Sequence, residues 1–345
     1  MKRILFGAIG AMLCIDAPHA ATTDAAAYAP AGAIPLGPTE RWDYVTYDAT
    51  GHRAYVAHGD HVTVVDTDKR MALGDIGTFP GGTHGIAIVP DAGIGYTDDG
   101  DAGEAIAFDL KTLAVLKKIK ADKDADGIYY DEASKHVFVI NADSGTITVI
   151  DPKVNEAVAT IKVGEGLEAA EPDHKGKLFV DGVEKHQIIV VDTRSNEVSA
   201  RYPMEGCERP HGIALDAKTR RVFATCVNKV AIVLDADSGK PIAKLAIGAG
   251  SDGAAFDAKR KLFLSSNGEG TLSVIAEKSA DDFAAQADVA TAKGARTIAI
   301  DPASGNVFLP AATVAKVEPP EKPGGRARTI YAPGSLKLLV LAPPK

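Results

Sequence analysis

The chain has 345 residues, of which 46% are hydrophobic and 24% charged, and its formal net charge near pH 7 is −8. This acidic balance argues against nonspecific nucleic-acid binding, which needs a basic face that neutralises phosphates. None of the three cysteines belongs to a Cys-x-x-Cys-His motif, which argues against a covalently attached c-type haem.

The first 20 residues have the composition of a secretory signal peptide. Lys2 and Arg3 precede an apolar stretch at 4–15, and small residues lie around Ala20. A basic start followed by an apolar stretch too short to span a bilayer is typical of such signals. We therefore expect a signal peptide at 1–20, a flexible segment at 21–31, and a periplasmic or secreted protein without a membrane span.

One short phrase recurs seven times along the rest of the chain. The copies are DYVTYD, HGIAIV, DGIYYD, EAAEPD, HGIALD, DGAAFD and RTIAID, and their first residues are 41 to 44 positions apart. Short apolar runs separated by Gly, Asp and Pro at this period are typical of a four-stranded antiparallel propeller blade. Seven copies predict an all-β, seven-bladed β-propeller.

Each copy continues with segments that fit three further strands. The second is an apolar run such as 54–58 or 222–226, the third is a β-branched run that ends in Asp, and the fourth resembles 156–164. Runs of Val, Ile, Phe and Tyr suit strands buried between stacked blades, and helical periodicity is almost absent.

The two ends of the repeat region complement one another. Residues 335–345 resemble a third strand and no fourth-strand segment follows them, whereas residues 32–43 resemble the fourth-strand segment 159–171. A seventh blade closed by an N-terminal strand would leave no unpaired radial edge. We therefore expect one propeller over residues 32–345.

The third copy, DGIYYDEASKHVFVINADSGTITVIDPKVNEAVATIKVG at 126–164, shows the repeat most fully. It resembles the YVTN-type (YncE-like) β-propeller repeat of bacterial periplasmic and surface proteins, and the resemblance covers about residues 32–345. It implies a rigid disc that binds at its central channel. Members of that family have varied activities, so the resemblance transfers no catalytic residue.

Cys207 and Cys226 flank one predicted hairpin in the fifth copy. Antiparallel pairing would bring them together, and an oxidising compartment favours a disulfide. Two unpaired buried thiols are the alternative.

The first residue of each repeated phrase is the main candidate for function. In a propeller the first strand of each blade lines the axis, so these residues should meet at one mouth of the channel. All are ionisable, which is unusual for positions that only pack. The candidate ligand-binding residues are Asp43, His84, Asp126, Glu168, His211, Asp252 and Arg296.

A second layer is expected at the ends of the second strands, where His58 and Asp99 should approach the same mouth. Imidazole and carboxylate ligands suit a divalent transition metal. The sequence therefore indicates a possible divalent metal site formed by His58, His84, Asp99 and His211.

Several interpretations of the mouth remain open. It could be a solvated, internally paired rim, a site for a small molecule or a protein or peptide partner, or a metal site of a lactonase-like hydrolase or lyase. No GxSxG elbow, HExxH, P-loop or dinucleotide motif is present. We favour a binding protein, without nucleic acid as partner, that is monomeric.

Two further features carry expectations. Trp42 should pack between the seventh and first blades rather than stack on a ligand. The Pro-rich, charged segment 310–335 should be a flexible extended connector, with a lid or a second contact surface as the alternative.

Overall fold

The computed structural model describes residues 28–38, 41–320, 322 and 327–344. The expected signal peptide at 1–20, and residues 21–27 of the expected flexible segment, lie outside these residues. Within them, no helix is long and apolar enough to cross a membrane. The one helical element described is a short 3-10 turn at Pro90–Ala92.

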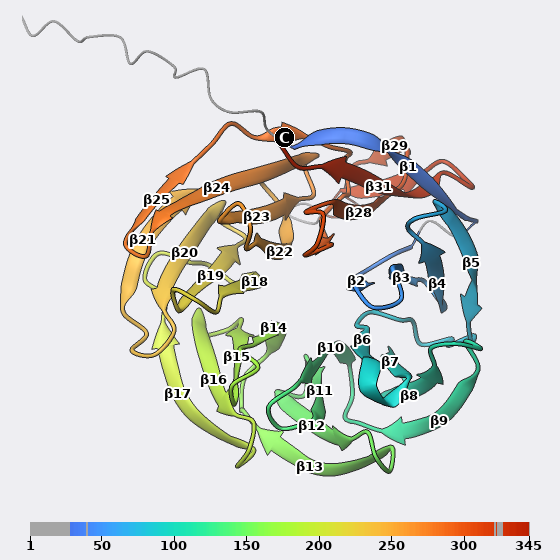
Figure 1. Cartoon of the computed structure of the whole chain (residues 1–345). Coiled ribbons are helices and arrows are strands. Elements are labelled where there is room, and N and C mark those ends of the chain that lie inside the picture. Colours follow the sequence, from blue (N-terminus) through green and yellow to red (C-terminus); the bar gives the residue numbers. More distant parts are fainter. Residues whose placement is uncertain (1–27, 39–40, 321, 323–326, 345) are drawn as a thin grey trace, which may run out of the picture.

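Seven antiparallel sheets surround a central axis, each with its first strand innermost (Figure 1). This confirms the predicted all-β, seven-bladed propeller. Blade 1 contains β2 (Val45–Asp48), β3 (Arg53–His58), β4 (His61–Asp66) and β5 (Met71–Ile76). Blade 2 contains β6 (Ala87–Val89), β7 (Ile94–Asp99), β8 (Glu104–Asp109) and β9 (Val115–Lys120). Blade 3 contains β10 (Ala125–Asp131), β11 (His136–Asn141), β12 (Thr146–Asp151) and β13 (Glu156–Lys162).

The next three blades repeat this arrangement. Blade 4 contains β14 (Leu167–Pro172), β15 (Lys177–Gly182), β16 (Gln187–Asp192) and β17 (Glu197–Pro203). Blade 5 contains β18 (Pro210–Asp216), β19 (Arg221–Cys226), β20 (Val230–Asp235) and β21 (Pro241–Ala246). Blade 6 contains β22 (Ser251–Asp257), β23 (Leu262–Asn267), β24 (Thr271–Ser279), and an outer edge split into β25 (Asp282–Ala285) and β26 (Val289–Ala290), which both pair with β24.

Blade 7 is assembled from both ends of the described chain, as predicted. Its strands are β27 (Ala299–Ile300), β28 (Val307–Ala311), β31 (Leu336–Ala342) and, outermost, β1 (Ala29–Gly37). Ile34 of β1 lies opposite Leu338 of β31, and both side chains are buried.

The propeller begins before residue 32, where its start was expected. Strand β1 starts at Ala29, and the Tyr28 hydroxyl donates a hydrogen bond to the Asp257 carboxylate of blade 6 at 2.8 Å. Tyr28 itself is buried. Residues 28–31 are therefore part of the folded disc, because their backbone pairs with β31 and Tyr28 packs on the neighbouring blade.

Burial explains the residue types of the repeat. The second strands carry one aromatic side chain each at an equivalent, buried position, since every blade packs on two neighbours. These side chains are Tyr55, Tyr96, Phe138, Phe179, Phe223, Phe263 and Phe308. Third strands are buried along nearly their whole length, whereas the outer strands of blades 1 to 5 are mostly exposed or half-buried.

The aspartates that end the third strands make the turns that follow. Asp109 accepts backbone hydrogen bonds from Lys111 and Thr112, and Asp192 accepts them from Arg194 and Ser195. These local bonds replace ladder hydrogen bonds where the chain reverses. The recurrent Asp is thus a turn-forming residue.

Trp42 packs between blades 7 and 1, as predicted. It is buried in a cluster with Ile34, Val45 and Leu338, and its ring makes an edge contact with Tyr331 at a centroid distance of 4.9 Å.

The expectation of a flexible extended connector at 310–335 is wrong for its described part. Strands β29 (Val314–Glu318) and β30 (Arg328–Tyr331) form an antiparallel hairpin. The Trp42–Tyr331 contact anchors this hairpin to the disc. Each arm contains two β-branched residues, Val314 and Val317 in one and Thr329 and Ile330 in the other, which favour strands and which the surrounding prolines obscured in the sequence.

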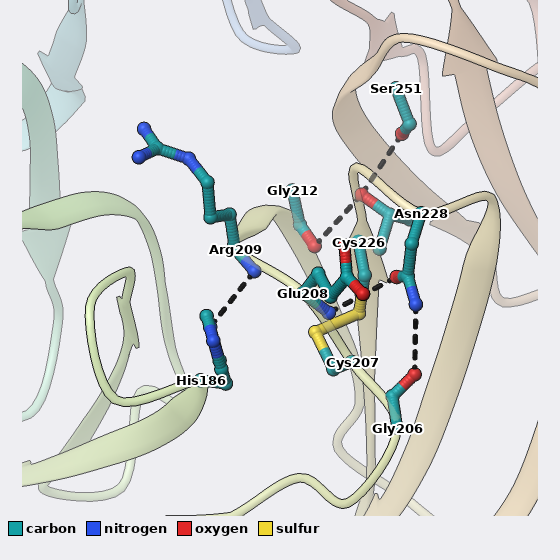
Figure 2. Close-up of a disulfide and its surroundings, with 10 residues drawn as sticks. His186, Gly206, Cys207, Glu208, Arg209, Gly212, Cys226, Asn228 and Ser251 are labelled. Carbon is teal, nitrogen blue, oxygen red and sulfur yellow. Dashed lines mark hydrogen bonds between the residues drawn. A yellow bond between two sulfur atoms is a disulfide. The ribbon is translucent and has the colours of Figure 1, made fainter.

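The predicted disulfide joins Cys207 and Cys226, whose Cα atoms are 5.5 Å apart (Figure 2). The surrounding loop is held on both sides of Cys207, because the Asn228 amide donates to the Gly206 carbonyl and its oxygen accepts from the Glu208 N–H. The His186 ring nitrogen accepts a hydrogen bond from the Arg209 N–H at 3.0 Å, which ties the loop to blade 4.

Replacing Cys207 and Cys226 together by alanine is expected to lower the free energy of unfolding by about 3 kcal/mol, because the disulfide closes a loop with a sequence separation of 19. Denaturant unfolding of both proteins without reductant measures the difference. Reductant should bring the wild type to the level of the variant and leave the variant unchanged. Equal stabilities before reduction would contradict the prediction.

Candidate functional site

The first residues of the seven repeated phrases lie together at one end of the channel. We call Asp43, His84, Asp126, Glu168, His211, Asp252 and Arg296 the charged ring. The ring is connected from blade to blade, since Arg296 contacts Asp43 and Asp252, and His211 contacts Asp252 and Glu168. Asp43 and Asp126 complete it through their electrostatic interactions with His84. The side chains with ion pairs are 19% to 33% exposed, so solvent reaches the ring.

One arc of the ring is internally neutralised. Arg296 places Nη2 3.0 Å from Asp43 Oδ2 and Nε 2.5 Å from Asp252 Oδ2. His211 Nδ1 lies 3.1 Å from Asp252 Oδ1. Burial would raise the pKa of Asp252, but the hydrogen bond from His211 and the charge of Arg296 hold it below its usual range. Asp252 is therefore a paired carboxylate.

The opposite arc is acidic. Burial, and after it the negative charge of Asp43, raises the pKa of Asp126 well above its usual range. Burial and the charges of Asp126, Asp252 and Asp43 do the same for Glu168. No Lys or Arg of the described chain forms an ion pair with either carboxyl group, and the basic group that approaches Glu168 is the His211 ring, with Nδ1 at 3.8 Å. This arc favours a proton or an added cation.

Tyr44 crosses the channel beneath the acidic arc. Its hydroxyl, which comes from blade 1, donates to Glu168 Oε1 of blade 4 at 3.3 Å. Burial and the neighbouring acids raise the pKa of Tyr44 well above its usual range, so the hydroxyl remains a donor.

His84 forms a dyad with Asp98, a residue that the sequence analysis did not single out. His84 Nδ1 is 2.7 Å from Asp98 Oδ2, and Asp98 Oδ1 accepts the backbone N–H groups of His84 and Gly85. Burial opposes protonation of His84, but its hydrogen bond to Asp98 and the charges of Asp98, Asp126 and Asp43 raise the pKa to about 9. The imidazole is a cation near neutral pH.

The four predicted metal ligands His58, His84, Asp99 and His211 are not brought together. His58 Nδ1 lies 2.9 Å from Thr63 Oγ1 inside blade 1, and Asp99 accepts the Gly81 N–H at 2.9 Å. The last residue of a second strand faces hydroxyls of the third strand, as Asn141 shows by donating to Thr146 and Thr148. The residue before it faces the inner strand, and in blade 2 that residue is Asp98.

A different group of three side chains is spaced closely enough to coordinate one metal ion. One oxygen each from Glu168 and Asp252 and one ring nitrogen of His211 all lie within 4.8 Å of one another, the only such set of three within the described residues. Imidazole and carboxylate ligands suit a divalent transition metal. His211 is the one residue shared with the predicted set.

The disulfide lies beside this site. Cys207 precedes the inner strand β18, and Cys226 pairs with Pro210, the residue before His211 (Figure 2). The covalent bond therefore fixes the backbone from which His211 enters the ring.

Comparison with solved structures finds proteins that share the fold of this chain. Its structure is similar to hydrazine synthase of Kuenenia stuttgartiensis, with a TM-score of 0.68, 15% identity, and coverage of 92% of this chain and 99% of that chain. It is similar to the WD40 repeats of RRP9, with a TM-score of 0.76 and 10% identity, and the match covers 92% of this chain and 100% of that chain. It is also similar to a chain of the mitotic checkpoint complex, with a TM-score of 0.73 and 13% identity, and the match covers 100% of this chain and 99% of that chain.

At these identities the likeness supports the propeller fold alone. A scan of family models and a search of curated proteins give no match to the chain.

The double variant Asp126→Asn/Glu168→Gln is expected to be more stable than the wild type near pH 8. Both carboxyl groups have raised pKa values in the folded state. The folded state therefore retains protons that the unfolded chain loses above pH ~4, and stability falls as pH rises from there toward the folded pKa values. Thermal unfolding near pH 4 and near pH 8 measures the difference, which should shrink at the lower pH.

Asp252→Asn provides the matched control, because His211 and Arg296 pair with this ring carboxyl and hold its pKa below the usual range. It should give no such gain. A double variant that is less stable than the wild type near pH 8 would show that the acidic arc is neutralised in another way.

Proposed function

We propose that this protein is a periplasmic ligand-binding β-propeller that captures a cationic group at its charged ring. The cationic group would belong to a small molecule or to a side chain of a protein or peptide partner. The observation that carries the proposal is the acidic arc, where Asp126 and Glu168 lie without a Lys or Arg partner in the described chain.

The other residues of the charged ring also favour a cationic ligand over an anionic one. Arg296 and the protonated His84 are already engaged with Asp43, Asp252 and Asp98. The ring thus offers an arriving cation two further carboxylates and a Tyr44 hydroxyl at a partly desolvated position, where ionic hydrogen bonds are stronger than at an open surface. An anionic ligand would meet these same carboxylates and be repelled.

The location in the periplasm rests on the signal-like residues 1–20 and on the disulfide, which persists in oxidising compartments. The disc shape with an axial site is shared by many binding propellers.

A thermal-shift screen of size-matched cationic, neutral and anionic small molecules without an apolar body, near pH 7, tests the proposal. Cationic compounds should raise the midpoint of the wild type, because ligands that bind only the folded state stabilise it. In Asp126→Asn/Glu168→Gln, the ligand-induced shift, measured from the variant's own midpoint, should disappear.

Glu132→Gln is the control, since this exposed carboxyl lies away from the ring, in the turn after β10. It should retain the shifts. Stabilisation by anions only, or cation shifts that survive the double variant, would refute the proposal.

A metal-assisted hydrolase or lyase is the second candidate function. It is favoured by the Glu168, His211 and Asp252 group. These residues would hold a divalent ion, which would supply a water of lowered pKa. The His84–Asp98 dyad would hold a proton on His84 at the same end of the channel.

Elemental analysis of the purified protein decides this second candidate. About one equivalent of a divalent metal is expected in the wild type and in His84→Ala, and its loss is expected in His211→Ala, because only His211 belongs to the group. Melting curves confirm that both variants are folded. A metal-free wild type after incubation with Zn²⁺ and desalting would exclude the candidate.

A further inference from the structure

A second, chemically different space lies on the other side of Tyr44. A cavity of about 690 Å³ receives residues from the inner region of all seven blades and reaches the turns that follow the inner strands, at Thr50, Glu132 and His174. None of the seven charged-ring residues lines it, whereas Tyr44 does. Since the Tyr44 hydroxyl bonds Glu168 of the ring, Tyr44 separates the two sites.

The wall of this cavity is more apolar than polar. Six isoleucines contribute to it, namely Ile86, Ile88, Ile128, Ile213, Ile298 and Ile300. Ligand cavities of small molecules typically measure ~300–1,000 Å³ and combine such walls with a few polar groups. The size and the lining therefore suit a small molecule with an apolar body.

Three acidic residues line the cavity, of which Asp48 and Glu132 lie at the turns and Glu171 lies within the wall. Glu171 lies halfway along the inner strand β14, and residues at the equivalent position in other blades are Thr46, Ala87, Tyr129, Ala214, Ala255 and Ala299. Glu171 is the only carboxyl group among them. No hydrogen bond or ion pair to its side chain is found within the described chain, although it lines the cavity.

The surroundings of Glu171 contain no cation. The four tyrosines that line the cavity, Tyr44, Tyr47, Tyr129 and Tyr130, have pKa values raised chiefly by burial, so they remain neutral. Asp48 accepts the Thr50 N–H at the end of β2. Glu132 and His174 lie at the turns, where the Glu132 N–H donates to the His174 ring.

We propose that this cavity binds a small primary amine with an apolar body, whose ammonium group pairs with the Glu171 carboxylate. An isolated carboxyl in an apolar wall is costly to ionise, and a cation delivered by the ligand removes that cost. The isoleucine wall accommodates the remainder of the molecule. This site is independent of the charged ring.

Proton release distinguishes this mode of binding from simple hydrophobic uptake. Burial raises the pKa of Glu171 to about 8, so near pH 7 the free protein carries the carboxyl in its protonated form. When an ammonium group binds, the carboxyl O–H bond breaks, the proton passes to the buffer, and the carboxylate pairs with the ammonium. About 0.9 proton should be released per amine bound.

Isothermal titration is carried out on the full chain with Asp126→Asn/Glu168→Gln, which removes cation binding at the charged ring, and the further variants are made in this background. Titration with 4-phenylbutylamine in buffers of different ionisation enthalpy measures both affinity and proton release. The uncharged analogue 4-phenylbutan-1-ol has nearly the same size. We expect the amine to bind roughly tenfold or more tightly than the alcohol, since a hydrogen bond between charged groups exceeds a neutral one by about this factor.

Glu171→Gln should reduce amine affinity to that of the alcohol and abolish the proton release. Glu197→Gln, in the exposed outer strand β17 of the same blade and outside the cavity, should change neither quantity. Amine binding that persists without Asp126 and Glu168 separates this site from the charged ring. Thermal unfolding establishes that each variant is folded.

Equal affinity for amine and alcohol, release of no proton, or unchanged binding in Glu171→Gln would overturn the proposal. Absence of any heat of amine binding at millimolar concentration would do the same.

Discussion

The pairing of β1 with β31 is the constraint on which the remaining structure depends. These strands come from opposite ends of the described chain, and their hydrogen bonds join blade 7 into a closed circle. Closure gives every blade two packed faces, which is why second and third strands are buried along almost their full length. It also holds residues more than 250 positions apart, such as Asp43 and Arg296, at hydrogen-bond distance.

The channel that results has two ends of different chemistry. At one end five carboxyl groups, including Asp98, meet three nitrogenous side chains, and most of them neutralise one another. At the other end isoleucines line a cavity in which Glu171 has no ion-pair partner among the described residues. Tyr44 lies between these ends and hydrogen-bonds Glu168. Buried acids that are not needed for packing lower stability, so their retention at both ends is more readily explained by binding than by folding.

The period of the repeat was sufficient to predict the seven blades, the closing strand and the disulfide, because each depends on strand order alone. The convergence of the charged-ring residues at one end of the channel followed from the same repeat. Side-chain direction was harder to predict. The inner strands of blades 3 to 6 have register shifts near their first residues, for example between Ala125 and Ile128, so counting alternate positions fails there. Asp98 was missed and Asp99 chosen because the side chain before the last residue of the second strand is the one that faces the inner segment. Glu171 was overlooked because a single blade departs from the repeat.

The place of β1 in the last blade determines the order in which the protein can fold. Strand β1 precedes all other described strands in the chain, yet its partner β31 is the last. A chain that emerges from its N-terminus must keep residues 29–37 unpaired until six blades have formed, whereas the Cys207–Cys226 bond needs only blade 5. Pairing of β1 with β31 is thus the final, long-range step of folding. A nascent chain that stalls before this step leaves the edge of β31 unpaired and accessible to other molecules.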